Sequence, residues 1–301
     1  MTELAAEPAG LDPLDDAPAA AVPPPLPPGR DVALPGGTVH LRELPGPADA
    51  PTVVLLHGWT ATADLNFFTC YAPLGERYRV LAFDHRGHGR GIRSRRLFRL
   101  EDCADDVAAM AELVGARDLI AIGYSMGGPI AQLLWRRHPE RVRGLVLAAT
   151  APHFNAHHRE RLSFLGLTGL AALARLTPAQ ARRWLSSQLY LQRKTATWSD
   201  WAAEQAAQHD WRMVLEAGRA IGAFRSDEWL GEIDVPTSVV VTMTDPVVPV
   251  RRQISLFDGI PRGRAWRVDA GHDAIVARPD RFVPVLLAAC DDVAARAARS
   301  Q

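Results

Sequence analysis

The sequence predicts an α/β protein with a mostly parallel central sheet, helices on both faces of the sheet, and a helical cap insertion. Short runs that are apolar throughout alternate along the chain with segments of helical periodicity, and strands of this kind need cover on both faces. Between Pro152 and Asp234 helical segments follow one another with no strand candidate. We therefore expect a core formed by residues 30–151 and 233–301, and a cap formed by residues 152–232.

The strand candidates begin with a hairpin, in which Pro35-Gly36-Gly37 turns the chain between Asp31–Leu34 and Thr38–Leu44. The later candidates are short apolar runs: Thr52–Leu56, Arg79–Phe83, Leu119–Gly123, Leu145–Ala149, Ser238–Thr242 and Ala265–Val268. The clearest helical segments between and after these runs are Leu100–Val114, Gly127–His138 and Arg281–Ala297. No internal repeat is evident, so we expect one main domain with an insertion.

Residues 1–29 differ in composition from the rest of the chain. They are rich in Ala and Pro, carry several acidic side chains and end in a proline cluster, which predicts a disordered or polyproline II tail. An export signal would need a basic start and a continuous apolar stretch, and neither is present here. No uninterrupted apolar run approaches the roughly 20 residues that cross a bilayer. We expect a cytoplasmic protein with no membrane partner.

Charge and cysteine usage narrow the class of partner. The chain has 34 basic and 34 acidic residues, so it lacks the net positive field that gathers nucleic acid. Cys70, Cys103 and Cys290 are scattered, odd in number and without metal-ligand spacing, which favours reduced thiols over disulfides or a metal site. We expect a small-molecule substrate, while the oligomeric state is left open.

The strongest motif is Gly123-Tyr124-Ser125-Met126-Gly127, which matches G-x-S-x-G between a predicted strand and a predicted helix. A serine on so tight a turn has a strained backbone, and Gly123 and Gly127 leave room for the neighbouring chain. The N-terminus of the following helix offers free N–H groups to a developing negative charge. Ser125 is therefore the candidate nucleophile.

A serine hydroxyl needs a base, and the base needs a carboxylate to orient it. His272 lies in a loop between the last predicted strand and the C-terminal helix, from which an imidazole can reach the serine. Asp245 follows the strand Ser238–Thr242 in a turn stiffened by prolines, and is the candidate acid. The alternative for Asp245 is an aspartate that begins the next helix.

Two backbone N–H groups are expected to stabilise the oxyanion, those of Trp59 and Met126. Trp59 follows the strand Thr52–Leu56, and Met126 follows the serine. His57 is assigned a structural role within the same loop. The loop from Asp84 to Gly91 is also expected to be structural.

From Asp31 onward, the loop at His57-Gly58, the D-x-R-G-H-G segment at Asp84, the serine motif, Asp245 and His272 resemble, in this order, the α/β-hydrolase fold superfamily. The resemblance is to its capped serine esterase, lactonase and perhydrolase-like group. It implies cleavage of a carboxylic ester, lactone or thioester of a small, largely apolar substrate through an acyl-enzyme, with no metal and no cofactor. Ser125 argues against the branches that use an aspartate nucleophile.

Trp59, Tyr124, Trp198 and Trp201 are the candidate substrate contacts. The alternative for the cap tryptophans is that they pack the cap against the sheet. Two other functions remain open, because the motifs fix the fold more tightly than the reaction. One is a cofactor-free non-hydrolytic enzyme, such as a perhydrolase, an acyltransferase or a C–C lyase or hydrolase. The other is a ligand-binding protein with residual turnover.

Overall fold

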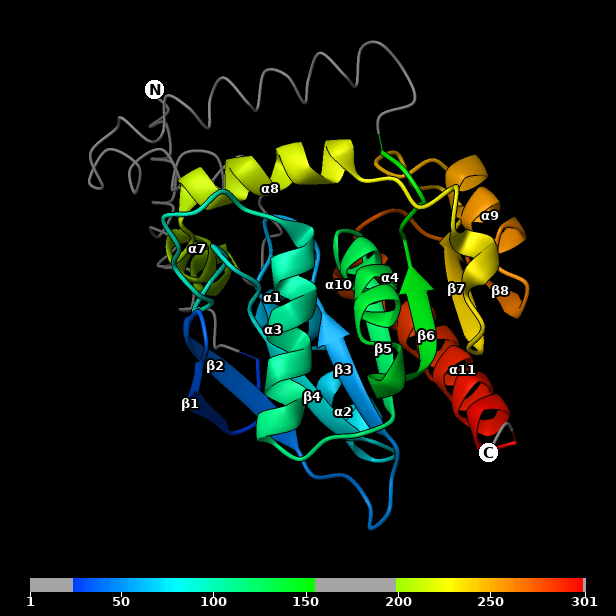
Figure 1. Cartoon of the computed structure of the whole chain (residues 1–301), viewed down its shortest axis with the longest axis horizontal. Helices are drawn as coiled ribbons and strands as arrows, with labels where there is room; N and C mark the ends of the chain where they lie inside the picture. The colour runs from blue at the N-terminus through cyan, green and yellow to red at the C-terminus, as the bar shows by residue number, and fades with distance from the viewer. Residues whose placement is uncertain (1–23, 155–198, 300–301) are drawn as a thin grey trace, which may run out of the picture.

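The computed structural model describes residues 24–154 and 199–299, and its centre is an eight-stranded sheet (Figure 1). The strands lie in the order β1-β2-β4-β3-β5-β6-β7-β8. The strand bounds are β1 Gly29–Leu34, β2 Gly37–Leu44, β3 Thr52–Leu56, β4 Arg79–Phe83, β5 Leu119–Tyr124, β6 Val142–Ala148, β7 Thr237–Thr242 and β8 Gly263–Val268. β1 and β2 are antiparallel to their neighbours, and the pairs from β4 to β8 are parallel. The predicted α/β class with a mostly parallel sheet is confirmed.

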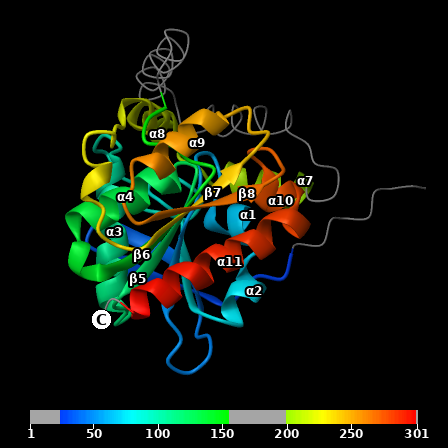
Figure 2. The ribbon, with the colours of Figure 1, turned by 90° about the vertical axis from the view of Figure 1, so that its right-hand side faces the viewer.

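Helices cover both faces of the sheet, as Figure 2 shows in side view. The helix bounds are α1 Ala63–Phe67, α2 Tyr71–Gly75, α3 Leu100–Leu113, α4 Gly127–Arg137, α9 Val250–Asp258, α10 Ala274–Ala277 and α11 Pro279–Ala298, with a short 3₁₀ turn η1 at Pro139–Arg141. Side chains of α3, α4 and α9 share one apolar cluster, and those of α1, α2, α10 and α11 share the other. The sheet therefore separates two cores.

The apolar runs form strands because both of their faces are buried. In β3 the side chains of Val54 and Leu56 join one cluster, and those of Val53 and Leu55 join the other, as the two-residue period of a strand requires. β8 departs from this pattern, because it is the edge strand and three of its six residues are exposed. Buried apolar strands accordingly occupy the middle of the sheet.

The described part of the predicted cap is helical. It contains α7 Ser199–Ala207, α8 Trp211–Ala223 and the 3₁₀ turn η2 Leu230–Glu232, with a single bridge between His153 and Arg225 as its β-structure. In Figure 1, α8 lies across the carboxyl ends of the strands, the ends toward which the arrows of β3 and β6 point. The rest of the predicted cap, residues 155–198, lies outside the described residues.

The predicted boundary of the disordered tail, at residue 29, lies too far along the chain, because the structure places residues 24–29 against the core. Gly29 is already paired with Arg42 in the β1–β2 ladder, and Leu26 packs against an apolar cluster of the core. The carbonyl of Pro27 accepts a hydrogen bond from Arg42 at 2.6 Å. Proline can lie at a strand entrance because no ladder N–H is needed from it there. Residues 1–23 are outside the described part of the chain.

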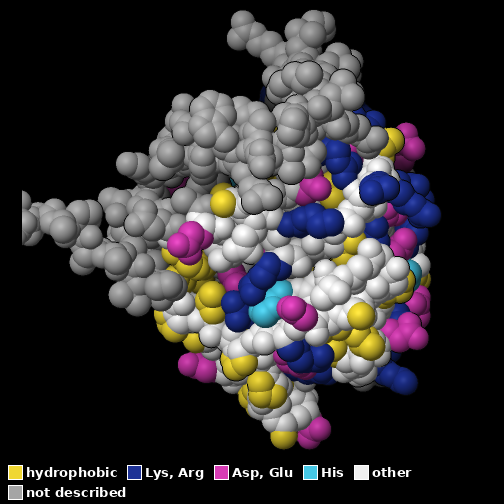
Figure 3. Space-filling view, turned by 90° about the vertical axis from the view of Figure 1, so that its left-hand side faces the viewer, with side chains coloured by type: hydrophobic (Ala, Val, Ile, Leu, Met, Phe, Trp, Pro, Cys, Tyr) yellow, Lys and Arg dark blue, Asp and Glu magenta, His cyan; other side chains and the backbone are white. Residues whose placement is uncertain are grey.

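The cysteines are buried free thiols: Cys103 lies in the cluster under α3, and Cys70 and Cys290 lie in the cluster under α11. None of the described helices is long and apolar enough to cross a bilayer. On the face shown in Figure 3, basic and acidic side chains are interspersed among the described residues. This mixture agrees with the balanced composition.

Candidate active site

Ser125 lies on the sharp turn between the end of β5 and the start of α4. Its φ of 53° is in the left-handed region, which a non-glycine residue adopts only at a cost. A Cβ on Gly123 would lie 2.3 Å from the carbonyl oxygen of Gly127, and a Cβ on Gly127 would lie 1.9 Å from that of Leu56. Small residues therefore flank the serine because backbone lies against them.

The structure brings Ser125, His272 and Asp245 into one hydrogen-bonded chain. The Nε2 atom of His272 lies 3.0 Å from Ser125 Oγ, and its Nδ1 atom lies 2.8 Å from Asp245 Oδ2. Since an ionised carboxylate only accepts, Nδ1 carries the proton in the neutral ring and Nε2 is free to accept the serine proton. This is the geometry of an activated serine nucleophile.

Asp245 is held by its own turn. Its Oδ1 accepts the backbone N–H groups of Val247 and Val248, both at 2.8 Å, and its Oδ2 accepts the hydroxyl of Thr242 at 2.7 Å. Burial alone would raise the pKa of Asp245. The hydrogen bond and attraction to His272, together with the hydrogen bonds from Val248 and Thr242, outweigh burial and lower it. Asp245 is therefore an anion that orients His272, and it precedes α9 rather than capping it.

Gln253 also contacts this carboxylate, and its role was not predicted from the sequence. Its Nε2 atom lies 3.3 Å from Asp245 Oδ2, and its Oε1 accepts the backbone N–H of Thr242 at 3.0 Å. A glutamine on a helix that follows the acid carries no recognisable motif. Only the packing of α9 against β7 brings it to Asp245.

The loop after β3 is the predicted source of one oxyanion donor. The N–H of Gly58 donates to Asn66 Oδ1 at 2.7 Å, and the carbonyl of Gly58 accepts from His57 Nδ1 at 2.8 Å. Because a trans peptide points its N–H away from its C=O, fixing the Gly58 carbonyl also fixes the direction of the Trp59 N–H. Neither this N–H nor that of Met126 donates to an acceptor within the described part of the chain.

His57 is the structural residue that the sequence predicts. It is fully buried, and its Nε2 atom accepts the backbone N–H of His85 at 2.9 Å. Burial lowers the pKa of His57 to about 3, so the ring is neutral. In the following loop, Asp84 likewise accepts from the backbone N–H groups of Ala63 and Arg90, both at 2.7 Å, which agrees with a structural role.

A cavity of about 420 Å³ opens beside Ser125 and His272. Three of the predicted substrate contacts, Trp59, Tyr124 and Trp201, line this cavity, whereas Trp198 lies outside the described residues. The other lining residues are Gly58, Thr60, Ala61, Leu65, Asn66, Phe68, Ala202, Asp273, Ile275 and Val276. Apolar and aromatic side chains make up much of this lining, and Asn66, Thr60 and Asp273 add polar groups to it.

Tyr124 and Trp201 have structural contacts as well. The hydroxyl of Tyr124 donates to the carbonyl oxygen of His272 at 2.5 Å, and burial raises the pKa of this phenol, so it stays protonated. The rings of Trp201 and Phe68 meet edge to face at 5.8 Å. Trp201 therefore both packs α7 on the core and faces the cavity.

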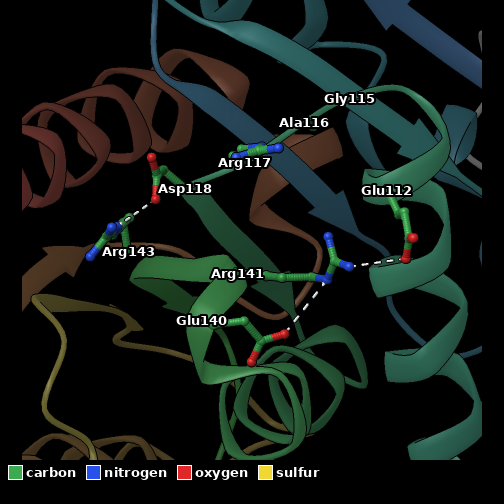
Figure 4. Close-up of a pocket in the computed structure, with 8 residues that line it drawn as sticks. All are labelled: Glu112, Gly115, Ala116, Arg117, Asp118, Glu140, Arg141 and Arg143. Atoms are coloured by element: carbon green, nitrogen blue, oxygen red, sulfur yellow. Dashed lines mark hydrogen bonds and ion pairs between the residues drawn. The ribbon is translucent and has the colours of Figure 1, made fainter.

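A second hollow, of about 520 Å³, lies near the N-terminal ends of β5 and β6, away from Ser125 (Figure 4). Two of its arginines pair with acidic neighbours: Arg141 contacts Glu112 at 3.0 Å and Arg143 contacts Asp118 at 2.5 Å. Ligands of such sheets bind at the carboxyl ends of the strands, where Ser125 lies. The cavity beside Ser125 is thus the candidate active site.

The family match agrees with the geometry. The α/β-hydrolase fold family model matches residues 51–279, and the chain belongs to this family. The "Putative carbamate hydrolase RutD" of Agrobacterium fabrum is 28% identical over 80% of this chain and 93% of that protein. The "Proline iminopeptidase PfmaB" of Pestalotiopsis fici is 38% identical over 38% of this chain and 41% of that protein.

Solved structures share the fold at low identity. The enol-lactonase from Burkholderia xenovorans LB400 superimposes with a TM-score of 0.70 and 22% identity, covering 87% of this chain and 100% of that one. The bromoperoxidase from Bacillus anthracis gives a TM-score of 0.74 at 17% identity, covering 88% and 100%. At these identities the likeness concerns the fold.

Proposed function

We propose that this protein is a serine hydrolase that cleaves a carboxylic ester, lactone or thioester of a small, largely apolar substrate. The observation that carries the proposal is the hydrogen-bonded chain from Ser125 through His272 to Asp245 beside an apolar cavity. In this arrangement the Asp245 carboxylate orients the imidazole, His272 acts as the base and Ser125 is the nucleophile.

In the proposed mechanism, His272 Nε2 takes the proton of Ser125 Oγ as Oγ attacks the substrate carbonyl carbon. The negative charge formed on the carbonyl oxygen is stabilised by the N–H groups of Trp59 and Met126. Asp245 stabilises the imidazolium, which then gives its proton to the leaving alkoxide or thiolate. Water, deprotonated by His272, attacks the acyl-enzyme, and the acid leaves as Ser125 regains its proton.

Perhydrolysis is a second candidate, because hydrogen peroxide can replace water in the last step. Among the relatives, the "Bifunctional esterase/perhydrolase DCH" of Acinetobacter calcoaceticus is 35% identical over 36% of this chain. Peracid formation that depends on added peroxide and exceeds hydrolysis would favour this reaction. Carbamates should be tested beside the esters, because a relative that matches over 80% of this chain is named a putative carbamate hydrolase.

The test is hydrolysis of a chromogenic ester series from acetate to long acyl chains. We expect wild-type activity with a chain-length optimum, and loss of that activity in Ser125→Ala. Ser255→Ala, which removes an exposed hydroxyl on α9, is the matched control and should retain the rate. Equal rates in wild type and Ser125→Ala, or no activity toward any substrate of the panel, would contradict the proposal.

A further inference from the structure

The loop that carries the Trp59 N–H is tied to the cap at three points. Trp59 Nε1 donates to the carbonyl oxygen of Val214 at 2.7 Å. The carbonyl oxygen of Thr60 lies 3.3 Å from His209 Nε2, and the hydroxyl of Thr62 lies 3.3 Å from Gln205 Oε1. We call residues 59–62 the oxyanion loop and residues 205–214 the cap clamp. Each contact joins segments more than 140 residues apart in sequence.

His209 has a defined tautomer at the centre of the cap clamp. The backbone N–H of Gly89 donates to its Nδ1 atom at 2.8 Å, so Nδ1 carries no proton. In the neutral ring the proton is on Nε2, which donates to the Thr60 carbonyl. Asp210 extends this attachment, because its N–H donates to the carbonyl of Gly87 at 2.7 Å. His209 is thus seated on the loop after β4 and from there contacts the oxyanion loop.

The oxyanion loop needs such support because its backbone is strained. Thr60 is β-branched and has a φ of 61°, a conformation that costs free energy unless the surroundings hold it. The contact from His209 is to the carbonyl of this same residue. Trp59 links the oxyanion site to the cap, since its N–H is the proposed oxyanion donor and its indole is anchored on α8.

We propose that the cap clamp positions the oxyanion loop, with His209 as a positioning residue for the hydrolysis. This inference rests on the proposed function, because it assigns the loop the role of oxyanion donor. Loss of the His209 contact removes a support of the strained Thr60 backbone. The Trp59 N–H keeps the direction that the His57–Gly58 hydrogen bond sets, but the loop that carries it is less firmly held at the distance that the transition-state oxygen requires. The cap thereby affects the rate of the chemical step as well as the choice of substrate.

The kinetic test compares His209→Ala with His209→Gln, whose amide offers both a donor and an acceptor. We expect kcat of His209→Ala to fall about 10- to 100-fold, with KM changed less than about threefold, because an oxyanion donor acts on the transition state. Affinity for a trifluoromethyl ketone, which forms a tetrahedral adduct, should fall by a similar factor. His209→Gln should recover most of kcat.

The matched control is Glu216→Gln, which weakens another contact between cap and core. It also weakens the ion pair of Glu216 with Arg212, a clamp residue that makes none of the three contacts with the oxyanion loop. Glu216 Oε2 accepts the backbone N–H of Phe98 at 2.9 Å, and this contact is to the 94–98 segment. We expect kcat of this variant to stay within about threefold of wild type. An equal fall of kcat in both variants, or a change in KM alone in His209→Ala, would overturn the positioning role.

Hydrogen exchange separates this inference from the proposed function. Amides of residues 58–62 should exchange faster in His209→Ala than in wild type, and their rates should be unchanged in Glu216→Gln. Unchanged exchange in His209→Ala refutes the clamp, whatever the activity. If exchange is faster in His209→Ala, but the wild type neither cleaves esters nor reacts with a fluorophosphonate, the clamp is supported and the hydrolase assignment is refuted.

Discussion

Lowering the pH from 7.5 to 5 should destabilise this protein through a cluster of buried histidines. The rings of His57, His85, His88 and His209 lie together. The ring centroids are 4.3 Å apart for His57 and His85, 5.2 Å apart for His57 and His88, and 5.3 Å apart for His88 and His209. Burial lowers the pKa of all four, that of His57 to about 3 and that of His209 to about 4. The folded protein keeps these rings neutral.

The free energy of unfolding decreases as the pH falls, because the unfolded chain then binds more protons than the folded protein. The folded pKa values lie below the unfolded value of about 6.5, so below pH 6.5 the unfolded chain binds more protons and stability falls. Each pKa unit is about 1.4 kcal/mol, so at pH 5 His57 and His209 each remove about 2 kcal/mol from the free energy of unfolding. Together they remove about 4 kcal/mol, a large part of the roughly 5–15 kcal/mol of a typical domain.

Urea unfolding followed by tryptophan fluorescence at pH 7.5, 6 and 5 measures this loss. His209→Gln cannot take up the proton, so its loss between pH 7.5 and 5 should be smaller than that of wild type by about 2 kcal/mol. His138→Gln, which changes a partly exposed histidine paired with Asp105, is the surface control. Parallel pH profiles for wild type and His209→Gln would refute the reasoning.

Two further predictions concern the site itself. Asp245→Asn should lower kcat by about 10³- to 10⁴-fold in steady-state ester hydrolysis, because the imidazole loses its orienting anion; a loss below about tenfold would contradict this role. Trp201→Ala should shift the optimum of the acyl series toward longer chains, because the indole borders the cavity beside Ser125. An unchanged optimum in a variant that keeps its thermal unfolding midpoint would show that Trp201 only packs α7 on the core.

The strands of the sheet could be predicted closely because their signal is local. Thr52–Leu56 and Arg79–Phe83 have the predicted bounds, since an apolar run between polar ends defines a buried strand. The short helices α1 and α2 were not predicted, because five residues are too few to show a helical period. The attachment of Pro24–Pro28 to the core was also missed, since proline-rich composition does not reveal a docking surface.

The same distinction applies to the site. Ser125, Asp245 and His272 were predicted because each has a characteristic place at the end of a strand, and the structure brings them together. The contacts of Asn66 and Gln253, and those of the cap clamp, were not predicted. They depend on backbone atoms and on packing between distant segments, and any hydrogen-bonding side chain in the right place can make them.

The buried thiols have a practical consequence for measuring stability. Cys70 lies under α11, where burial raises the pKa of its thiol to about 12, and burial also raises the pKa of Cys103 and Cys290. Thiolates are the reactive form, so the native protein should be inert to maleimides at neutral pH. Cys103 belongs to the core on one face of the sheet, and Cys70 and Cys290 belong to the core on the other. The rate at which each thiol is labelled therefore measures how often the core around it unfolds locally.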